Sequence, residues 1–145
     1  MAREDFKFSF GIRVRYSETD MQGIVFNSHY LTYFDTAITE YVRWLEYDFQ
    51  EHIEELGQDV HTVHVDLDFH SPCRYDDELD VCVRVSKLGK SSLTFRVEIF
   101  LKGQEELKTS GQVVWVNTDQ KEHQARPLPR ELVDLINLRQ ACRLG

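Results

Sequence analysis

The sequence predicts an α+β protein in which a five-stranded antiparallel sheet wraps around one long central helix. Five stretches alternate apolar and polar residues with a period of two, which is the side-chain period of a β-strand. Between the first and second of these stretches, apolar residues recur at helical spacing instead. A sheet with one apolar face needs a cover, and this single long helix is the obvious candidate.

Four of the strand-like stretches alternate cleanly and the fifth is looser. In order they cover residues 6–16, 63–69, 79–85, 93–101 and 107–116. The apolar side of the second is made by Val63, Val65, Leu67 and Phe69. Such alternation indicates antiparallel strands, because parallel strands covered on both faces read as continuous apolar runs. Turn-like segments at 88–91 and 102–104 predict hairpins, so we expect the last four strands to form a meander or something close to it.

The helical stretch runs over residues 30–45, and its apolar residues form one stripe with polar residues opposite. Ser28 is the expected N-cap of this helix. A second, short helix is predicted over 49–56 and ends at Gly57. A third is predicted from residue 130 to about residue 143.

The chain of 145 residues fits one domain over 1–145, with no linker, repeat or low-complexity tract. It is 41% hydrophobic and 29% charged, the balance of a soluble globular protein. The net charge of −8 argues against nucleic-acid binding, which requires a basic face. No window approaches the ~20 apolar residues that span a bilayer, and no signal peptide is indicated. Three cysteines without metal-site spacing are expected to be reduced thiols in a cytoplasmic protein.

The loop before the long helix carries the residues that could take part in a reaction. Asp20 stands just ahead of Gly23 and a helix start. Backbone N–H groups at a helix start bind negative charge or a polarised carbonyl oxygen. A carboxylate opposite such donors has the parts for acyl transfer. From these residues alone, the alternative that Asp20 only caps a short turn stays open.

The same loop resembles a known family. Residues 16–37 contain the pattern Y-x-x-x-D-x-x-G-I-V-F-x-x-x-Y-x-x-x-F-D-x-A, which is similar to the motif of the 4-hydroxybenzoyl-CoA thioesterase family. The Pro-x-x-x-x-Asp turn at 72–77 and the segment 87–95 match as well, so the resemblance covers about residues 8–118. It implies the hotdog fold and an acyl-CoA thioesterase, a hydrolase that needs no cofactor.

The resemblance also implies roles for individual residues. Asp20 matches the catalytic aspartate, and the amides from Gly23 to Asn27 match those that polarise the thioester carbonyl. Tyr30 is expected in the wall of the acyl pocket. The residues expected to meet the pantetheine and coenzyme A are Lys90, Ser91 and Ser92.

Several points stay open at this stage. Asp20 can act as a nucleophile, through a mixed anhydride, or as a general base on water. The acyl group and its carrier, coenzyme A or acyl carrier protein, are undetermined. Five long strands offer more surface than one helix covers, so we expect a homodimer or homotetramer. The resemblance implies a site at a subunit interface.

Other interpretations compete with this one. Glu18 is an alternative working carboxylate, although we expect it to be solvated. A strand face with acids and histidines resembles a weak metal site: His64, Asp66, Asp68 and His70. Four cationic residues have two equal interpretations: they bind the phosphates of coenzyme A as a cationic lip, or they are the solvated side chains of a hairpin. These residues are Lys87, Lys90, Arg96 and Lys102. At the level of function, the alternatives are a hotdog dehydratase or hydratase and a non-catalytic protein that binds acyl thioesters.

Overall fold

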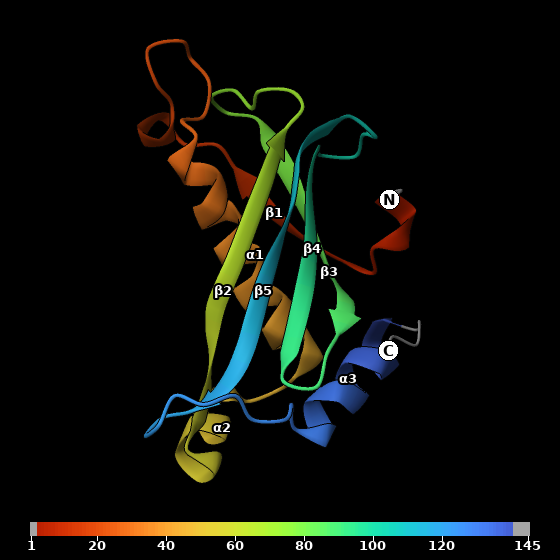
Figure 1. The fold of residues 1–145 in the computed structure, drawn as a ribbon. Coiled ribbons are helices and arrows are strands. Elements are labelled where there is room, and N and C mark those ends of the chain that lie inside the picture. Colours follow the sequence, from red (N-terminus) through yellow and green to blue (C-terminus); the bar gives the residue numbers. More distant parts are fainter. Residues whose placement is uncertain (1–2, 141–145) are drawn as a thin grey trace.

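The computed structural model describes residues 3–140 (Figure 1). Within this range the chain forms five strands, three α-helices and two short 3₁₀ turns. The strands are β1 (Phe8–Arg13), β2 (Gln58–Phe69), β3 (Glu78–Leu88), β4 (Ser92–Leu101) and β5 (Leu107–Asp119). The helices are α1 (Ser28–Leu45), α2 (Phe49–Leu56) and α3 (Arg130–Gln140), and the 3₁₀ turns cover Arg3–Asp5 and Tyr16–Glu18.

The five strands of this part of the chain form one antiparallel sheet in the order β1-β3-β4-β5-β2. The predicted sheet is confirmed, and so are the hairpins that join β3 to β4 and β4 to β5. The expected meander is wrong for β2, which pairs with β5 and not with β3. A tight turn holds successive strands side by side, whereas the longer segment 70–77 allows β2 to reach the far edge.

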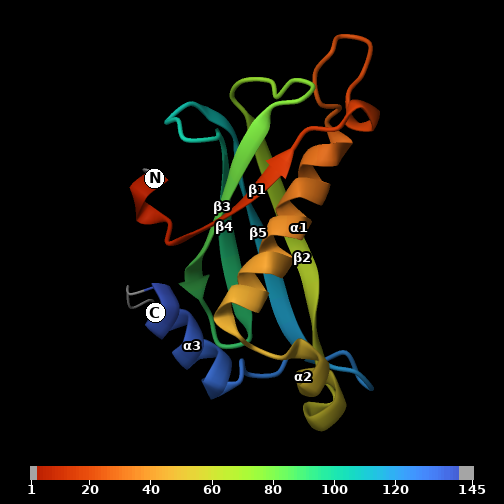
Figure 2. The same cartoon turned by 180° about the vertical axis from the view of Figure 1, so that it is seen from behind.

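Helix α1 crosses one face of the sheet and forms the core with it (Figure 2). Its buried stripe follows the predicted spacing and consists of Tyr30, Tyr33, Phe34, Ala37, Ile38, Tyr41 and Leu45. The ring of Phe34 lies over Gly111 of β5. A Cβ at Gly111 would be 2.9 Å from Phe34 Cε2 and 2.1 Å from the carbonyl oxygen of Asp66 on β2. Glycine therefore permits the close approach of both the helix and the edge strand.

The first two strands have bounds that differ from the prediction. β1 ends at Arg13, before the expected residue 16, because the chain turns into the 3₁₀ segment Tyr16–Glu18. β2 begins at Gln58, before the expected residue 63. A bulge next to Val63 interrupts the pairing of β2 with β5 and leaves that side chain 59% exposed. The expectation that Val63 faces the core is therefore wrong.

The helices largely match the prediction. Helix α1 begins at Ser28, so the expected N-cap is wrong: Asn27 holds that position, without a side-chain capping bond. Helix α2 has the predicted bounds, and Gly57 ends it with a left-handed φ of 64°. The predicted end of the third helix near residue 143 lies outside the described residues. None of the helices within 3–140 is long and apolar enough to cross a membrane.

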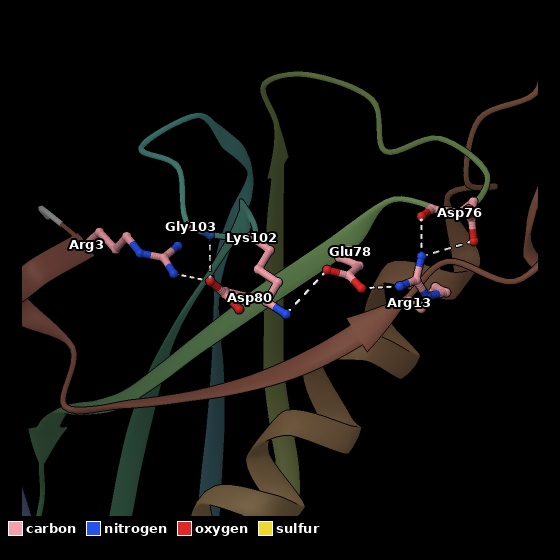
Figure 3. Close-up of polar contacts among 7 residues, drawn as sticks. All are labelled: Arg3, Arg13, Asp76, Glu78, Asp80, Lys102 and Gly103. Atoms are coloured by element: carbon pink, nitrogen blue, oxygen red, sulfur yellow. Dashed lines mark hydrogen bonds and ion pairs between the residues drawn. The ribbon is translucent and has the colours of Figure 1, made fainter.

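A network of ion pairs and hydrogen bonds fastens strand β3 to its neighbours at one end of the sheet (Figure 3). Its members are Arg3, Arg13, Asp76, Glu78, Asp80, Lys102 and Gly103. Asp80 pairs with Arg3 and accepts the N–H of Gly103 (3.2 Å). Glu78 pairs with Lys102 (3.3 Å) and with Arg13 of β1. The network thus holds β1 and the β4–β5 turn at the end of the sheet where the loop before α1 lies.

Candidate active site

The loop between β1 and α1 folds into a tight turn at Asp20. The Asp20 N–H donates to the carbonyl of Ile24 (2.9 Å), and the Gly23 N–H donates to the carbonyl of Asp20 (3.0 Å). Gly23 has a φ of 75°, in the left-handed region that favours glycine. Asp20 Oδ1 accepts the N–H of Gln22 (2.8 Å), as in an Asx turn. The local capping role is thus realised for one carboxylate oxygen, while Oδ2 has no hydrogen-bond partner among residues 3–140.

The arm that returns from this turn to α1 is attached on two sides. The Val25 N–H donates to the carbonyl of Cys73 (2.8 Å), between β2 and β3. The Phe26 N–H donates to the carbonyl of Glu18 (2.9 Å). Ile24 also forms an isolated β-bridge with Arg74. The loop and segment 70–77 are therefore one unit at the same end of the sheet (Figure 1).

These bonds decide which backbone amides are available to polarise a carbonyl. In the expected run from Gly23 to Asn27, the N–H groups of Gly23, Val25 and Phe26 already donate within the protein. The N–H groups of Ile24 and Asn27 have no acceptor in the described part of the chain. The tight turn uses the Gly23 N–H, and the expectation that Gly23 binds the substrate stays a prediction. The backbone N–H of Asn27 remains available as a donor, and the N–H of Ile24 is the second available donor.

A pocket of about 270 Å³ lies beside these two amides. Its walls are formed by Ile24, Val25, Asn27, Tyr30, Phe69, His70, Ser71 and Pro72. Phe69 packs edge-on against Tyr30, with ring centroids 5.2 Å apart. The sequence did not identify Phe69, His70 or Ser71 as pocket residues, because an alternating strand pattern does not show what lies beside its end. The Pro-x-x-x-x-Asp match that begins at Pro72 was the available signal.

Asp20 is half-buried and lies next to the pocket without forming its wall. Its backbone is bonded to Ile24, and its side chain acts on Tyr30 electrostatically. Burial raises the pKa of Tyr30 to about 12, and the negative charge of Asp20 adds to this shift. The Tyr30 hydroxyl accepts the N–H of Cys73 (3.2 Å). Tyr30 is thus a neutral residue of the pocket wall, and its expected contact with an acyl group stays a prediction.

Glu18 is buried, so the expectation that it is solvated is wrong. Its side chain is only 5% exposed. Oε1 accepts the N–H of Arg15 (2.8 Å) and the hydroxyl of Tyr33 (2.8 Å). Burial alone would raise the pKa of Glu18, but these hydrogen bonds and the Arg15 charge lower it overall. The 3₁₀ turn at Tyr16–Glu18 directs the carboxylate onto α1, which a period-two interpretation of this stretch could not show.

Cys73 and Cys82 are buried free thiols, and the histidine-rich strand face does not form a metal site in the described part of the chain. Burial raises the pKa of both Cys73 and Cys82 to about 11, so these thiols stay protonated at neutral pH. Among residues 3–140, no three His, Cys, Asp or Glu side chains are grouped to hold a metal ion. On the suspected face, His64 Nε2 lies 3.2 Å from Asp66 Oδ2, and His70 Nε2 lies 2.8 Å from Ser110 Oγ.

The residues expected to meet coenzyme A lie far from Asp20 within one chain. Lys90 and Ser91 lie in the turn between β3 and β4 and Ser92 begins β4, at the opposite end of the sheet from the loop before α1 (Figure 1). The carbonyls of Lys90 and Ser91 accept the N–H groups of Leu128 (2.9 Å) and Asn117 (2.8 Å). The Lys90 carbonyl therefore holds the segment after β5 and the Ser91 carbonyl holds β5 itself, and a single chain does not bring them to the pocket.

The four cationic residues do not form a single patch, so the interpretation as a cationic lip is wrong for one chain. Lys87 and Lys90 lie at the β3–β4 end of the sheet, whereas Lys102 lies at the other end and pairs with Glu78. Arg96, in the middle of β4, pairs with a carboxylate that is 1% exposed, Glu98 (3.0 Å). Antiparallel strands separate these cations, and their acidic partners neutralise two of them.

A carboxylate beside two available backbone amides and a small pocket, at the start of a helix covered by an antiparallel sheet, has the parts that acyl transfer requires. Comparison with known proteins gives the family. A model described as the thioesterase superfamily matches residues 22–108, and the chain belongs to this superfamily.

Individual relatives support the same assignment over most of the chain. The acyl-CoA thioester hydrolase YbgC of Escherichia coli O157:H7 is 26% identical over 126 residues, which is 87% of this chain and 92% of that protein. A thioesterase of Thermus thermophilus, solved in complex with coenzyme A and Zn, has a TM-score of 0.81 at 26% identity and covers 97% of this chain and 99% of its own. The PA5185 protein of Pseudomonas aeruginosa has a TM-score of 0.82 at 26% identity, with 99% and 96% coverage. The predicted hotdog fold is confirmed.

Proposed function

We propose that this protein hydrolyses an acyl-CoA thioester to a free acid and coenzyme A, with Asp20 as the catalytic carboxylate. The observation that carries the proposal is that two residues whose backbone N–H groups have no acceptor among residues 3–140, Ile24 and Asn27, both line a pocket next to Asp20. The relatives support the substrate class, since one is an acyl-CoA thioester hydrolase and another binds coenzyme A.

Thioester chemistry suits a site with few groups. An alkyl thiolate leaves readily because the pKa of its thiol is about 8.5, so a strong general acid is not needed. The carbonyl oxygen of the substrate would accept the N–H groups of Ile24 and Asn27, and each such donor is worth about 3 kcal/mol in the transition state. Asp20 Oδ1 is held by Gln22, which leaves Oδ2 as the reacting oxygen.

Two routes use this oxygen. In the first, Oδ2 of Asp20 bonds to the carbonyl carbon, the carbon–sulfur bond breaks, and water then cleaves the mixed anhydride. In the second, Oδ2 takes a proton from water, whose oxygen attacks the carbonyl carbon directly. Both routes release a carboxylic acid and the thiol of coenzyme A.

A second copy of the chain would complete the site. Strand β2 is a sheet edge in the single chain, with unpaired backbone groups that a second β2 can bond. Antiparallel pairing of two β2 strands reverses the ends of the partner sheet. The partner's β3–β4 turn would then lie at the same end as Asp20, which gives the turn at residues 90–92 a route to the substrate.

The test is thiol release from a panel of acyl-CoA and acyl-carrier-protein thioesters, with wild type beside Asp20→Asn. We expect the variant to lose at least about a hundredfold in kcat on the best substrate. Asp134→Asn, which changes a carboxylate on α3 whose side chain is 60% exposed, is the matched control and should keep wild-type activity. Full activity of Asp20→Asn would overturn the assignment of Asp20.

Two further measurements separate the remaining alternatives. Single turnover in ¹⁸O-labelled water places label in Asp20 if the anhydride forms, and only in the product acid if Asp20 is a base. A wild type that binds acyl-CoA without releasing thiol would instead be a non-catalytic binding protein. Hydration of crotonyl-CoA without thiol release would indicate a hydratase.

A further inference from the structure

Glu18 is a buried carboxylate that the proposed mechanism does not use. Oε1 accepts two hydrogen bonds, from the N–H of Arg15 and the hydroxyl of Tyr33, both at 2.8 Å. Oε2 pairs with the guanidinium of Arg15 (3.1 Å). With both oxygens occupied and 5% of the side chain exposed, Glu18 is not placed to contact a substrate.

Tyr33 connects Glu18 to the pocket wall. It lies near the start of α1 and is 2% exposed. Its ring packs edge-on against Tyr30, with centroids 6.0 Å apart and planes at 74°. Because Tyr30 lines the pocket, the hydrogen bond from Tyr33 to Glu18 fixes the loop relative to that wall.

The backbone of Glu18 extends this connection to both proposed catalytic parts. Its carbonyl accepts the N–H of Phe26 (2.9 Å), the residue before Asn27. Asp20 is two residues after Glu18 along the chain. One buried residue therefore holds the arm that carries the carboxylate and the arm that carries an oxyanion donor.

We infer that Glu18, held by Tyr33, is a positioning residue that sets the distance between the Asp20 carboxylate and the Asn27 amide. This inference rests on the proposed function. It predicts a loss in kcat with little change in KM, because the pocket that binds the acyl group remains while the reacting groups lose alignment.

The variants are Glu18→Gln, which keeps shape but removes the charge, and Tyr33→Phe, which removes one hydroxyl. We expect kcat to fall about a hundredfold for Glu18→Gln and about tenfold for Tyr33→Phe, with KM changed less than about twofold. Tyr41→Phe is the matched control. Tyr41 is also a buried tyrosine of α1 whose hydroxyl bonds to a side chain, that of Gln140, but it lies near the other end of the helix.

A second background separates positioning from general loss of structure. In Asp20→Asn, adding Tyr33→Phe should change the residual rate less than about twofold, because a positioning residue acts through the group it positions. An equal tenfold loss in both backgrounds would overturn the inference. A kcat for Tyr33→Phe no lower than that of Tyr41→Phe would overturn it as well.

Hydrogen exchange of the loop amides tests the inference without activity. Glu18→Gln and Tyr33→Phe should speed exchange at the bonded amides of Gly23, Val25 and Phe26 at least about tenfold, and Tyr41→Phe should not. Unchanged exchange overturns the inference. If Asp20→Asn keeps full activity, the proposed function fails, and the exchange rates still decide whether Glu18 holds the loop. If Glu18→Gln does not fold, Tyr33→Phe decides it alone.

Discussion

Replacing Gly111 with alanine is expected to destabilise the protein strongly, because two elements of the core approach this residue. A Cβ there would lie 2.1 Å from the carbonyl oxygen of Asp66 and 2.9 Å from the ring of Phe34. The first contact is with backbone, which cannot rotate away as a side chain can. Gly111 pairs with Leu67 of β2, so relief of the clash requires the edge strand to move.

The size of the effect follows from that movement. An ordinary contact between carbon and a carbonyl oxygen is about 3.3 Å, so β2 must shift by about 1 Å. Overpacking of this kind costs about 1–3 kcal/mol, and each weakened ladder hydrogen bond adds about 1 kcal/mol, which gives a loss of about 3 kcal/mol. For a domain of this size, the melting temperature should fall by about 6 to 12 °C.

Thermal and urea unfolding of Gly111→Ala measure this loss, and Gly11→Ala on β1 is the matched control. A Cβ at Gly11 meets nothing within 4 Å, so this change should alter the free energy of unfolding by less than about 1 kcal/mol. Equal unfolding midpoints for the two variants would refute the reasoning, since both change the same backbone entropy and only one has the clash.

Three further predictions concern titration and buried polar groups. The folded pKa of Glu18 lies below the ordinary value of 4.5, so its stabilising effect is present above that pH and is lost as the pH falls through the folded pKa. Glu18→Gln should therefore flatten the acid side of a stability-against-pH curve from urea unfolding, and identical slopes would contradict this. Cys73 and Cys82, with pKa values raised to about 11, should react with iodoacetamide at mildly alkaline pH far more slowly in the folded protein than in urea. Peptide mapping measures both rates, and equal rates would contradict this prediction. His52 is 3% exposed and its Nε2 lies 2.8 Å from Asn117 Oδ1, so His52→Ala should lower the free energy of unfolding by about 2 to 4 kcal/mol, and a loss below about 1 kcal/mol argues against this bond.

The fold was predictable from the sequence where buried side chains recur with the period of a helix or a strand. The stripe of α1 and the alternation of the strands both record which side chains face the core. Alternation does not record which strand lies alongside, so the pairing of β2 with β5 was not predictable in this way. A bulge shifts the period without a compositional sign, as Val63 shows.

The candidate site was predictable in part. The motif located Asp20, Asn27 and Tyr30 at one end of the molecule, because they belong to one continuous loop and helix start. The separation of Asp20 from residues 90–92 could be predicted by counting strands, because successive antiparallel strands place their connections at alternate ends of the sheet. The burial of Glu18 had no local sign, since its hydroxyl partner comes from a different element.

The attachment of the loop before α1 to segment 70–77 affects how such enzymes can be recombined. The Val25 N–H donates to the carbonyl of Cys73, and Ile24 lies opposite Arg74 in an isolated β-bridge, so segment 70–77 supplies a backbone partner that the loop lacks. A chimera that exchanges the loop alone would place the loop of one protein against segment 70–77 of another, although the backbones of these two segments are not adapted to each other. Transfer of both segments together is therefore the smallest exchange expected to carry substrate preference from one scaffold to another.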